Sequence, residues 1–258
     1  MPPAPREGAG QVGVVGGGIG GAALALALAQ RGVHAELLER DAGPGVRRQG
    51  YGLTMQQGGA ALRALGVDAS ALGVATGLHS SHVAATGEQV GAYGHAVSGG
   101  GSGRRRKPRR NNVHVPRTRL RDALLGRLEA GAVRWGATLE SYSERDDAVI
   151  ARLADGSERA YACLVGADGI YSRVRRQLEP EGALEYLGVL VVLGITPLAH
   201  PFAAERRVWQ SIDGDEATRL FAMPFDEGSY MWQLSFPMTE SEARALTATG
   251  GAGAQLEV

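Results

Sequence analysis

Residues 11–40 read QVGVVGGGIGGAALALALAQRGVHAELLER. The short apolar run Val12–Val15 predicts a β-strand that enters a glycine-rich turn. An alanine- and leucine-rich helix is expected to follow, from Ala22 to about Gln30. A second apolar run, Ala35–Leu38, predicts another strand, and it ends on Glu39. This order indicates a β-α-β unit, around which we interpret the rest of the chain.

The turn between the first strand and the helix has the spacing G-x-G-x-x-G. The first glycine permits a tight turn, the second lets the backbone approach a pyrophosphate, and the third lets the helix pack close to the sheet. The N–H groups at the helix N-terminus favour a phosphate. The candidate pyrophosphate-binding residues are therefore Gly16, Gly18, Ile19, Gly20 and Gly21.

Glu39 follows Gly21 by 18 residues, about where a carboxylate reaches a ribose hydroxyl in dinucleotide-binding units. Its charge repels a 2′-phosphate, which favours FAD or NAD over NADP. The chain holds 39 glycines in 258 residues. The glycine spacing alone could thus arise by chance about once. The alternative is a glycine-rich turn in an ordinary β-α-β unit; the flanking elements and Glu39 favour dinucleotide binding.

The composition is that of a globular protein, with 44% hydrophobic residues and 21% charged residues. The 27 basic and 27 acidic residues give no net charge, so we expect no nucleic-acid partner. Cys163 is the single cysteine, which excludes an internal disulfide and suits the cytoplasm. The apolar run 12–29 has five glycines within residues 16–21, so we expect no transmembrane segment.

Downstream, apolar runs predict a strand at Tyr51–Met55, a helix at Gly58–Leu65 and a strand at His82–Ala85. Leucines at helical spacing predict a further helix in residues 114–128, with Thr118 as its N-cap.

Two β-like runs, Ala148–Leu153 and Ala160–Val165, surround the turn dipeptide Asp155-Gly156 and predict a hairpin. The second run leads into Asp168, which is expected in a loop at the ligand edge of the sheet. The alternative for Asp168 is an Asp-Gly turn that caps a helix. Antiparallel strands are predicted at Leu187–Ile195, Arg207–Ile212, Thr218–Met223 and Tyr230–Phe236, and a helix at Glu240–Leu246.

Residues 98–112 read SGGGSGRRRKPRRNN and form a glycine-rich, strongly basic segment. A targeting signal, a nucleic-acid patch and a site for the NADPH phosphate are possible functions. A solvated, flexible loop is the favoured interpretation, because no aromatic residues for base stacking are interleaved.

Several segments together resemble the FAD-dependent aromatic-ring hydroxylases, the class A flavoprotein monooxygenases of the para-hydroxybenzoate hydroxylase type. They are residues 16–40, the segment VPRTRLRDALL with Arg117, and LVGADGIYSRVRRQL with Asp168. QGYGLTMQQGGAALRALGV is similar to the family's next strand and helix. The resemblance covers most of residues 11–178 and, more loosely, 187–236.

The resemblance implies an α/β fold. A Rossmann-like FAD-binding domain with a parallel sheet (residues 1–72 and 113–179) would be interleaved with an antiparallel-sheet substrate domain (73–112 and 180–258). The glycine turn and Glu39-Arg40 would hold the adenosine diphosphate half of FAD. Arg117 would approach the flavin diphosphate or ribityl chain, where the alternative is a solvated residue or a partner for Asp122. Asp168 would lie near the groove used by FAD and the nicotinamide, and Arg48 near the flavin entrance.

The family's later motif, a Gly-Asp followed by Ala-Ala-His-Pro, has no counterpart, because Gly214-Asp215 continues with Glu-Ala-Thr. We therefore expect a C-terminally truncated chain or a shortened relative.

The implied activity is a monooxygenase that uses FAD, NADPH or NADH, and O2 to hydroxylate or epoxidise a small aromatic or apolar substrate. A non-catalytic FAD- or NAD-binding remnant and a related flavin reductase or halogenase are the alternatives. The six histidines lack metal-ligand spacing, so no metal site is expected. Tyr230, Met231, Trp232 and Phe236 could face substrate, but sheet core is the favoured interpretation. The sequence identifies neither catalytic residues, nor the substrate, nor the oligomeric state.

Overall fold

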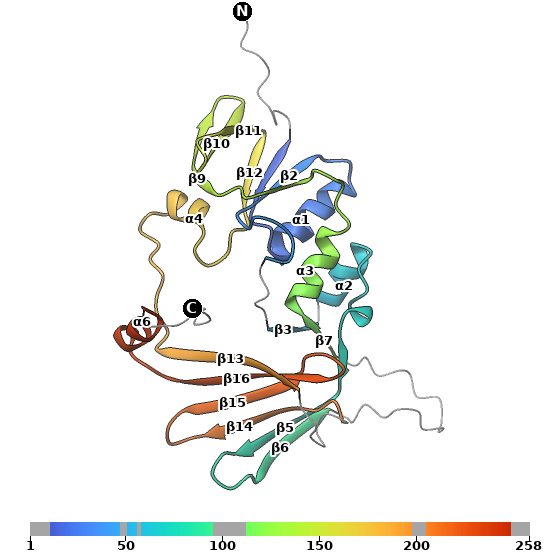
Figure 1. Ribbon diagram of the computed structural model, residues 1–258, viewed down its shortest axis with the longest axis vertical. Coiled ribbons are helices and arrows are strands. Elements are labelled where there is room, and N and C mark those ends of the chain that lie inside the picture. Colours follow the sequence, from blue (N-terminus) through green and yellow to red (C-terminus); the bar gives the residue numbers. More distant parts are fainter. Residues whose placement is uncertain (1–10, 47–50, 56–57, 95–111, 198–204, 249–258) are drawn as a thin grey trace, which may run out of the picture. The chain divides into compact units, whose positions relative to one another are not determined.

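A computed structural model describes residues 11–46, 51–55, 58–94, 112–197 and 205–248 (Figure 1). The chain divides into two compact units. Unit 1 comprises Met1–Gly50, Ala61–Val67 and Arg117–Leu184; unit 2 comprises Tyr51–Ala60, Asp68–Pro116 and Glu185–Val258. These boundaries differ from those expected from the sequence. Residues 51–60, 68–72 and 113–116 were expected in the FAD-binding domain but belong to unit 2. The reason is that strand β3 (Gly52–Met55) pairs with β7 (Asn112–Pro116).

Unit 1 is built on a four-stranded parallel sheet with the strand order β12-β1-β2-β8 (Figure 1). Its strands are β1 (Val12–Val15), β2 (Ala35–Glu39), β8 (Val133–Trp135) and β12 (Cys163–Gly166). The helices are α1 (Ile19–Ala29), α3 (Arg117–Leu125), which packs on α1, and α4 (Arg173–Leu178). A three-stranded antiparallel sheet contains β9 (Leu139–Arg145), β10 (Ala148–Leu153) and β11 (Glu158–Tyr161). The parallel sheet expected from the sequence is confirmed.

The core of unit 1 lies between the parallel sheet and its neighbours. Val14 and Leu37 are fully buried at the centre of the sheet, and Ala22 is buried on α1. Small residues on α1 allow the helix to lie close to the strands. Gly13, on β1, allows the antiparallel sheet to pack close to the parallel sheet, because a Cβ on Gly13 would lie 2.7 Å from the ring of Tyr161 on β11. Close approach of both layers thus depends on residues without bulky side chains.

Unit 2 contains a six-stranded sheet with the order β13-β16-β15-β14-β5-β6 (Figure 1). These strands are β5 (Leu78–Val83), β6 (Gln89–Gly94), β13 (Val189–Pro197), β14 (Val208–Asp213), β15 (Thr218–Pro224) and β16 (Ser229–Pro237). All neighbours are antiparallel except β14 and β5. Met231 is buried with Val208 and Met223, and Tyr230 is also buried. Both therefore belong to the core.

A smaller sheet of unit 2 has the order β3-β7-β4, with β4 at Val74–Thr76. Unit 2 also contains the 3-10 helix η1 (Ala69–Ala71) and α6 (Glu240–Ala248), whereas α2 (Gly58–Ala64) begins in unit 2 and continues into unit 1.

The structure corrects three local expectations. The run 160–165 is two strands: β11 pairs with β10, and β12 joins the parallel sheet, because the N–H of Ala162 donates to Gln11 O and turns the chain between the sheets. Thr118 lies inside α3 rather than capping it, since the helix begins directly after β7. The strand expected at 82–85 is the longer β5, which ends at Val83.

Candidate functional site: the carboxyl edge of the parallel sheet

The strands β1 and β12 end side by side, and their following loops touch. Gly16 has φ +104°, a conformation that favours glycine. A Cβ on Gly16 would lie 2.5 Å from Ala167 O and 2.8 Å from the Cα of Asp168. The chain runs from β1 to β2 on one side, whereas β12 lies on the other side, so this is the point where the strand order reverses. Such a point is where open α/β sheets bind ligands.

The N-terminus of α1 leads away from this point with its amide groups uncapped by a side chain. Gly18 is the N-cap residue, and the first turn of the helix carries no acidic residue. A Cβ on Gly18 or Gly20 would have no atom within 4 Å, whereas one on Gly21 would lie 1.9 Å from Gly16 O. The turn is therefore tight on its inner side and open on its outer side. This open, amide-lined surface fits a diphosphate group.

Glu39, the last residue of β2, lies against the glycine turn. Its Oε2 accepts a hydrogen bond of 2.8 Å from the N–H of Gly17, and its Oε1 accepts one of 2.9 Å from the N–H of Asp41. The backbone is held as well, because the N–H of Ala137 donates to Glu39 O at 2.8 Å. The structure thus brings together the carboxylate and the turn that the sequence predicted to share a ligand.

Arg121, from α3, also reaches this edge. Its Nε donates to Gly17 O at 2.6 Å, and its Nη2 lies 3.2 Å from Glu39 Oε2 and 3.3 Å from Asp41 Oδ2. The guanidinium carbon lies 5.6 Å from the centre of the Trp135 ring. Arg121 could not be predicted from the sequence, because three arginines alternate along RTRLR and no local pattern distinguishes one of them. The packing of α3 on α1 places Arg121 at this edge.

Asp168 follows β12 in the loop beside Gly16. Its Oδ1 accepts a hydrogen bond of 2.6 Å from the hydroxyl of Ser172, and its Oδ2 accepts one of 2.7 Å from the N–H of Arg173. Ser172 is the N-cap residue of α4 and accepts a hydrogen bond from the N–H of Arg175. These contacts support the start of α4, as the helix-capping alternative expected. They also fix the loop that borders the glycine turn.

Comparison with known proteins identifies the family. The family model of the FAD binding domain matches residues 9–249, nearly the whole chain. The chain belongs to the FAD-dependent monooxygenases of the para-hydroxybenzoate hydroxylase type. The aurachin C monooxygenase/isomerase of Stigmatella aurantiaca is 29% identical over 221 residues, which cover 85% of this chain and 55% of that protein. The chain thus spans about half the length of this curated relative.

Solved structures of this type share the fold. The 2,6-dihydroxypyridine-3-hydroxylase of Arthrobacter nicotinovorans superimposes with a TM-score of 0.75 at 20% identity, covering 91% of this chain and 58% of that one. A variant of HpxO from Klebsiella pneumoniae, solved with FAD, gives a TM-score of 0.73 at 18% identity, covering 92% and 62%.

The resemblance to these monooxygenases also identified three arginines as candidate cofactor-binding residues. Their positions in the structure differ. Arg117 is the first residue of α3 in unit 1 and is partly buried. Arg40 follows β2 and is exposed. Arg48 lies outside the described residues, as does the basic segment apart from Asn112, which begins β7. The roles of all three arginines stay predictions.

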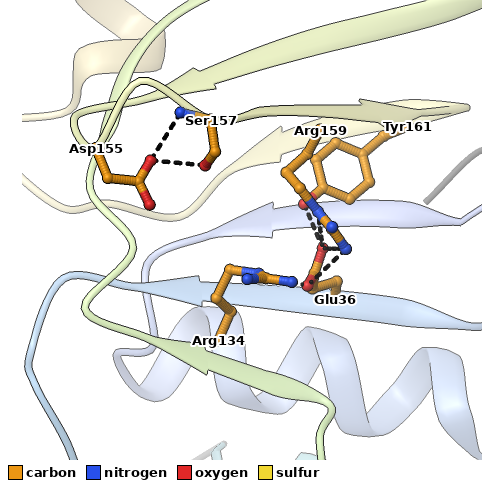
Figure 2. A network of polar contacts seen from close by, with 6 residues as sticks. All are labelled: Glu36, Arg134, Asp155, Ser157, Arg159 and Tyr161. Carbon is orange, nitrogen blue, oxygen red and sulfur yellow. Dashed lines mark hydrogen bonds and ion pairs between the residues drawn. The ribbon is translucent and has the colours of Figure 1, made fainter. Parts of the chain in front are cut away.

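A second carboxylate on β2, Glu36, is the centre of a network that the sequence did not reveal (Figure 2). Tyr161 donates to Glu36 Oε2 at 2.6 Å, Arg134 to Oε1 at 2.8 Å, and Arg159 Nη2 to Oε2 at 3.1 Å. Burial raises the pKa of Glu36, but these hydrogen bonds and the arginine charges outweigh it and hold the pKa below the usual 4.5. This network ties β2 to β8 and β11 and belongs to the framework of this flavoprotein fold.

Among the described residues, no helix is both long and apolar enough to cross a membrane.

Proposed function

We propose that this chain binds FAD through the carboxyl edge of unit 1 and that the protein is a monooxygenase. It would use NADPH or NADH, and O2, to hydroxylate or epoxidise a small aromatic or apolar substrate. The observation that carries the proposal is the uncapped, open glycine turn next to Glu39 and the Asp168 loop. Membership of the family and the activity named for the Stigmatella relative support it.

Each part of the edge has a proposed task. The amide groups at the start of α1 would hold the diphosphate, because no side chain caps them and the space beside Gly18 and Gly20 is open. Glu39 would accept from the adenosine ribose, and its charge would disfavour a 2′-phosphate. Arg117 would approach the diphosphate or ribityl region. Asp168, already bonded to Ser172 and Arg173, would shape the loop beside the flavin.

Bound FAD would supply the redox chemistry and the activation of O2. The protein's own contribution would be to bind and orient the cofactor and substrate and to exclude water. This division of tasks agrees with the residues described above, which form an amide-lined turn and two orienting carboxylates rather than a nucleophile-base pair.

The test is to purify the protein, record its visible spectrum with added FAD, and measure oxidation of NADPH and NADH together with O2 consumption. Flavin uptake with substrate-stimulated O2 consumption is the expected result. Flavin uptake without oxidation of either nicotinamide would support the non-catalytic FAD-binding alternative. Nicotinamide oxidation coupled to substrate reduction without O2 consumption would support a reductase. No flavin uptake would contradict the proposal.

A further inference from the structure

We infer that Arg121 is the positioning residue that sets Glu39 for recognition of the adenosine ribose. The inference rests on the proposed function, because it concerns the same FAD site. It adds a residue from a helix that is distant in sequence, with a defined effect on selectivity between ribose and deoxyribose.

The carboxylate of Glu39 has a restricted acceptor capacity. Two ionised oxygens offer about four acceptor positions. Oε2 is engaged by the N–H of Gly17 and by Arg121, whereas Oε1 accepts from the N–H of Asp41. The described contacts therefore leave one position, on Oε1, for a ligand hydroxyl. This makes the orientation of the carboxylate decisive, since a rotated side chain would offer a different oxygen.

Arg121 fixes that orientation from two sides. Its Nε donates to the carbonyl of Gly17, while its Nη2 contacts Glu39 Oε2, so one planar group holds both the turn and the carboxylate. The side chains of Arg121 and Glu39 are only 13% and 8% exposed. The Trp135 ring, 5.6 Å from the guanidinium carbon, supports the plane of the group.

Arg121 also balances two negative charges. Its Nη2 lies within 3.3 Å of oxygens from both Glu39 and Asp41. Without the cation, the two carboxylates would repel each other in a partly buried place. Glu39 would then turn away from Asp41, and the remaining acceptor position on Oε1 would change its direction. Loss of Arg121 should therefore remove the preference for ribose over deoxyribose, while the affinity for the diphosphate falls less.

The experiment measures the dissociation constants of ADP and 2′- and 3′-deoxy-ADP, with FAD as reference, for the wild-type chain, Arg121→Met and Arg121→Lys. The wild type should bind at least one deoxy analogue about tenfold more weakly than ADP, because a hydrogen bond to a carboxylate is lost. In Arg121→Met this ratio should fall to about one. Arg121→Lys restores the charge but not the two-sided contact, so its ratio should lie between those of the wild type and Arg121→Met.

The matched control is Arg127→Met. Arg127 follows the same helix and donates to the backbone carbonyls of Ala123 and Gly66. Arg127→Met should keep the wild-type ratio of the dissociation constants for the deoxy analogue and ADP. A general loss of stability, in contrast, would lower the affinity for all nucleotides equally. If Arg121→Met does not fold, as judged by circular dichroism, the decision rests on Arg121→Lys.

The outcomes separate this inference from the proposed function. A wild-type ratio retained in Arg121→Met, or in Arg121→Lys when only that variant folds, overturns the inference and leaves FAD binding intact. A wild-type protein that binds ADP and FAD but does not distinguish the deoxy analogues also overturns it. A wild-type protein that binds neither FAD nor ADP overturns the proposed function as well.

Discussion

Glu36 and Glu39 lie three residues apart on the same strand, yet their surroundings differ in kind. Their odd spacing places the two side chains on opposite faces of the sheet. Glu36 is surrounded by Tyr161, Arg134 and Arg159, which occupy both oxygens. Glu39 stands at the strand end beside an open glycine turn and keeps acceptor capacity on Oε1. The comparison teaches that Glu36, within the strand, is engaged on both oxygens by framework partners, whereas Glu39, at the strand end, keeps an acceptor position for the ribose contact proposed above.

Replacement of Glu36 by alanine should have the largest effect on the free energy of unfolding. The variant removes the buried carboxylate that pairs with the guanidinium of Arg159 and accepts a hydrogen bond from the hydroxyl of Tyr161. We expect a loss of about 3–5 kcal/mol, measured by urea denaturation. Arg134→Met is the control, since its side chain is 41% exposed and its removal should cost less than about 1 kcal/mol. A loss for Glu36→Ala as small as that of the control would remove the framework assignment.

Glu39→Arg should act mainly on the cofactor. It replaces the proposed ribose acceptor by a cation, and FAD affinity should fall about 10- to 100-fold. Fluorescence titration with FAD measures this change. Glu140→Arg, at a half-exposed position on β9, should leave the affinity unchanged. Unchanged FAD affinity in Glu39→Arg would eliminate the ribose assignment and with it the contrast to Glu36.

Gly18→Ala tests whether the open side of the turn is a ligand surface. No atom lies within 4 Å of the added methyl group, so the free energy of unfolding should change by less than about 1 kcal/mol. FAD affinity should nevertheless fall about tenfold, because the methyl group separates the backbone from the diphosphate. Gly43→Ala, which also adds its methyl group in open space, should change neither property. Equal FAD binding by the wild type and Gly18→Ala would show that the diphosphate does not approach this residue.

The smallest expected effect is the contribution of Glu36 to the pH dependence of stability. The pKa of Glu36 is lower in the folded chain than its usual 4.5, so the ionised form stabilises the fold above that pH. This stabilisation is lost as the pH falls below 4.5 through the folded-state value. Glu36→Gln should therefore lose less stability than the wild type between pH 7 and acid, as followed by thermal unfolding. Parallel pH profiles for the two proteins would contradict the assignment.

The glycine turn and Glu39 could be predicted because their signal is local. A strand, three glycines, a helix and an acidic residue follow one another within 30 residues, and each spacing has a physical reason. The structure keeps this order and begins α1 at Ile19, three residues earlier than expected, because Gly18 adopts the N-cap position.

The missed features depend on contacts between distant segments. Strand β8 has only three residues, Val133–Trp135, which is too short to show a period. Arg121 meets Gly17 across 104 residues of sequence, and Arg159 meets Glu36 across 123. The apolar run at 160–165 gave no sign that it would divide between two sheets, because either half suits a buried strand. These features follow from packing, which no single segment specifies.

The most direct test of the central claim compares FAD, ADP and FMN as ligands of the purified wild-type chain in equilibrium binding. If the carboxyl edge of unit 1 recognises the adenosine diphosphate half through the glycine turn and Glu39, FAD should bind, ADP should compete with it, and FMN should bind at least tenfold more weakly than FAD. Equal binding of FMN and FAD, without competition by ADP, would contradict the account.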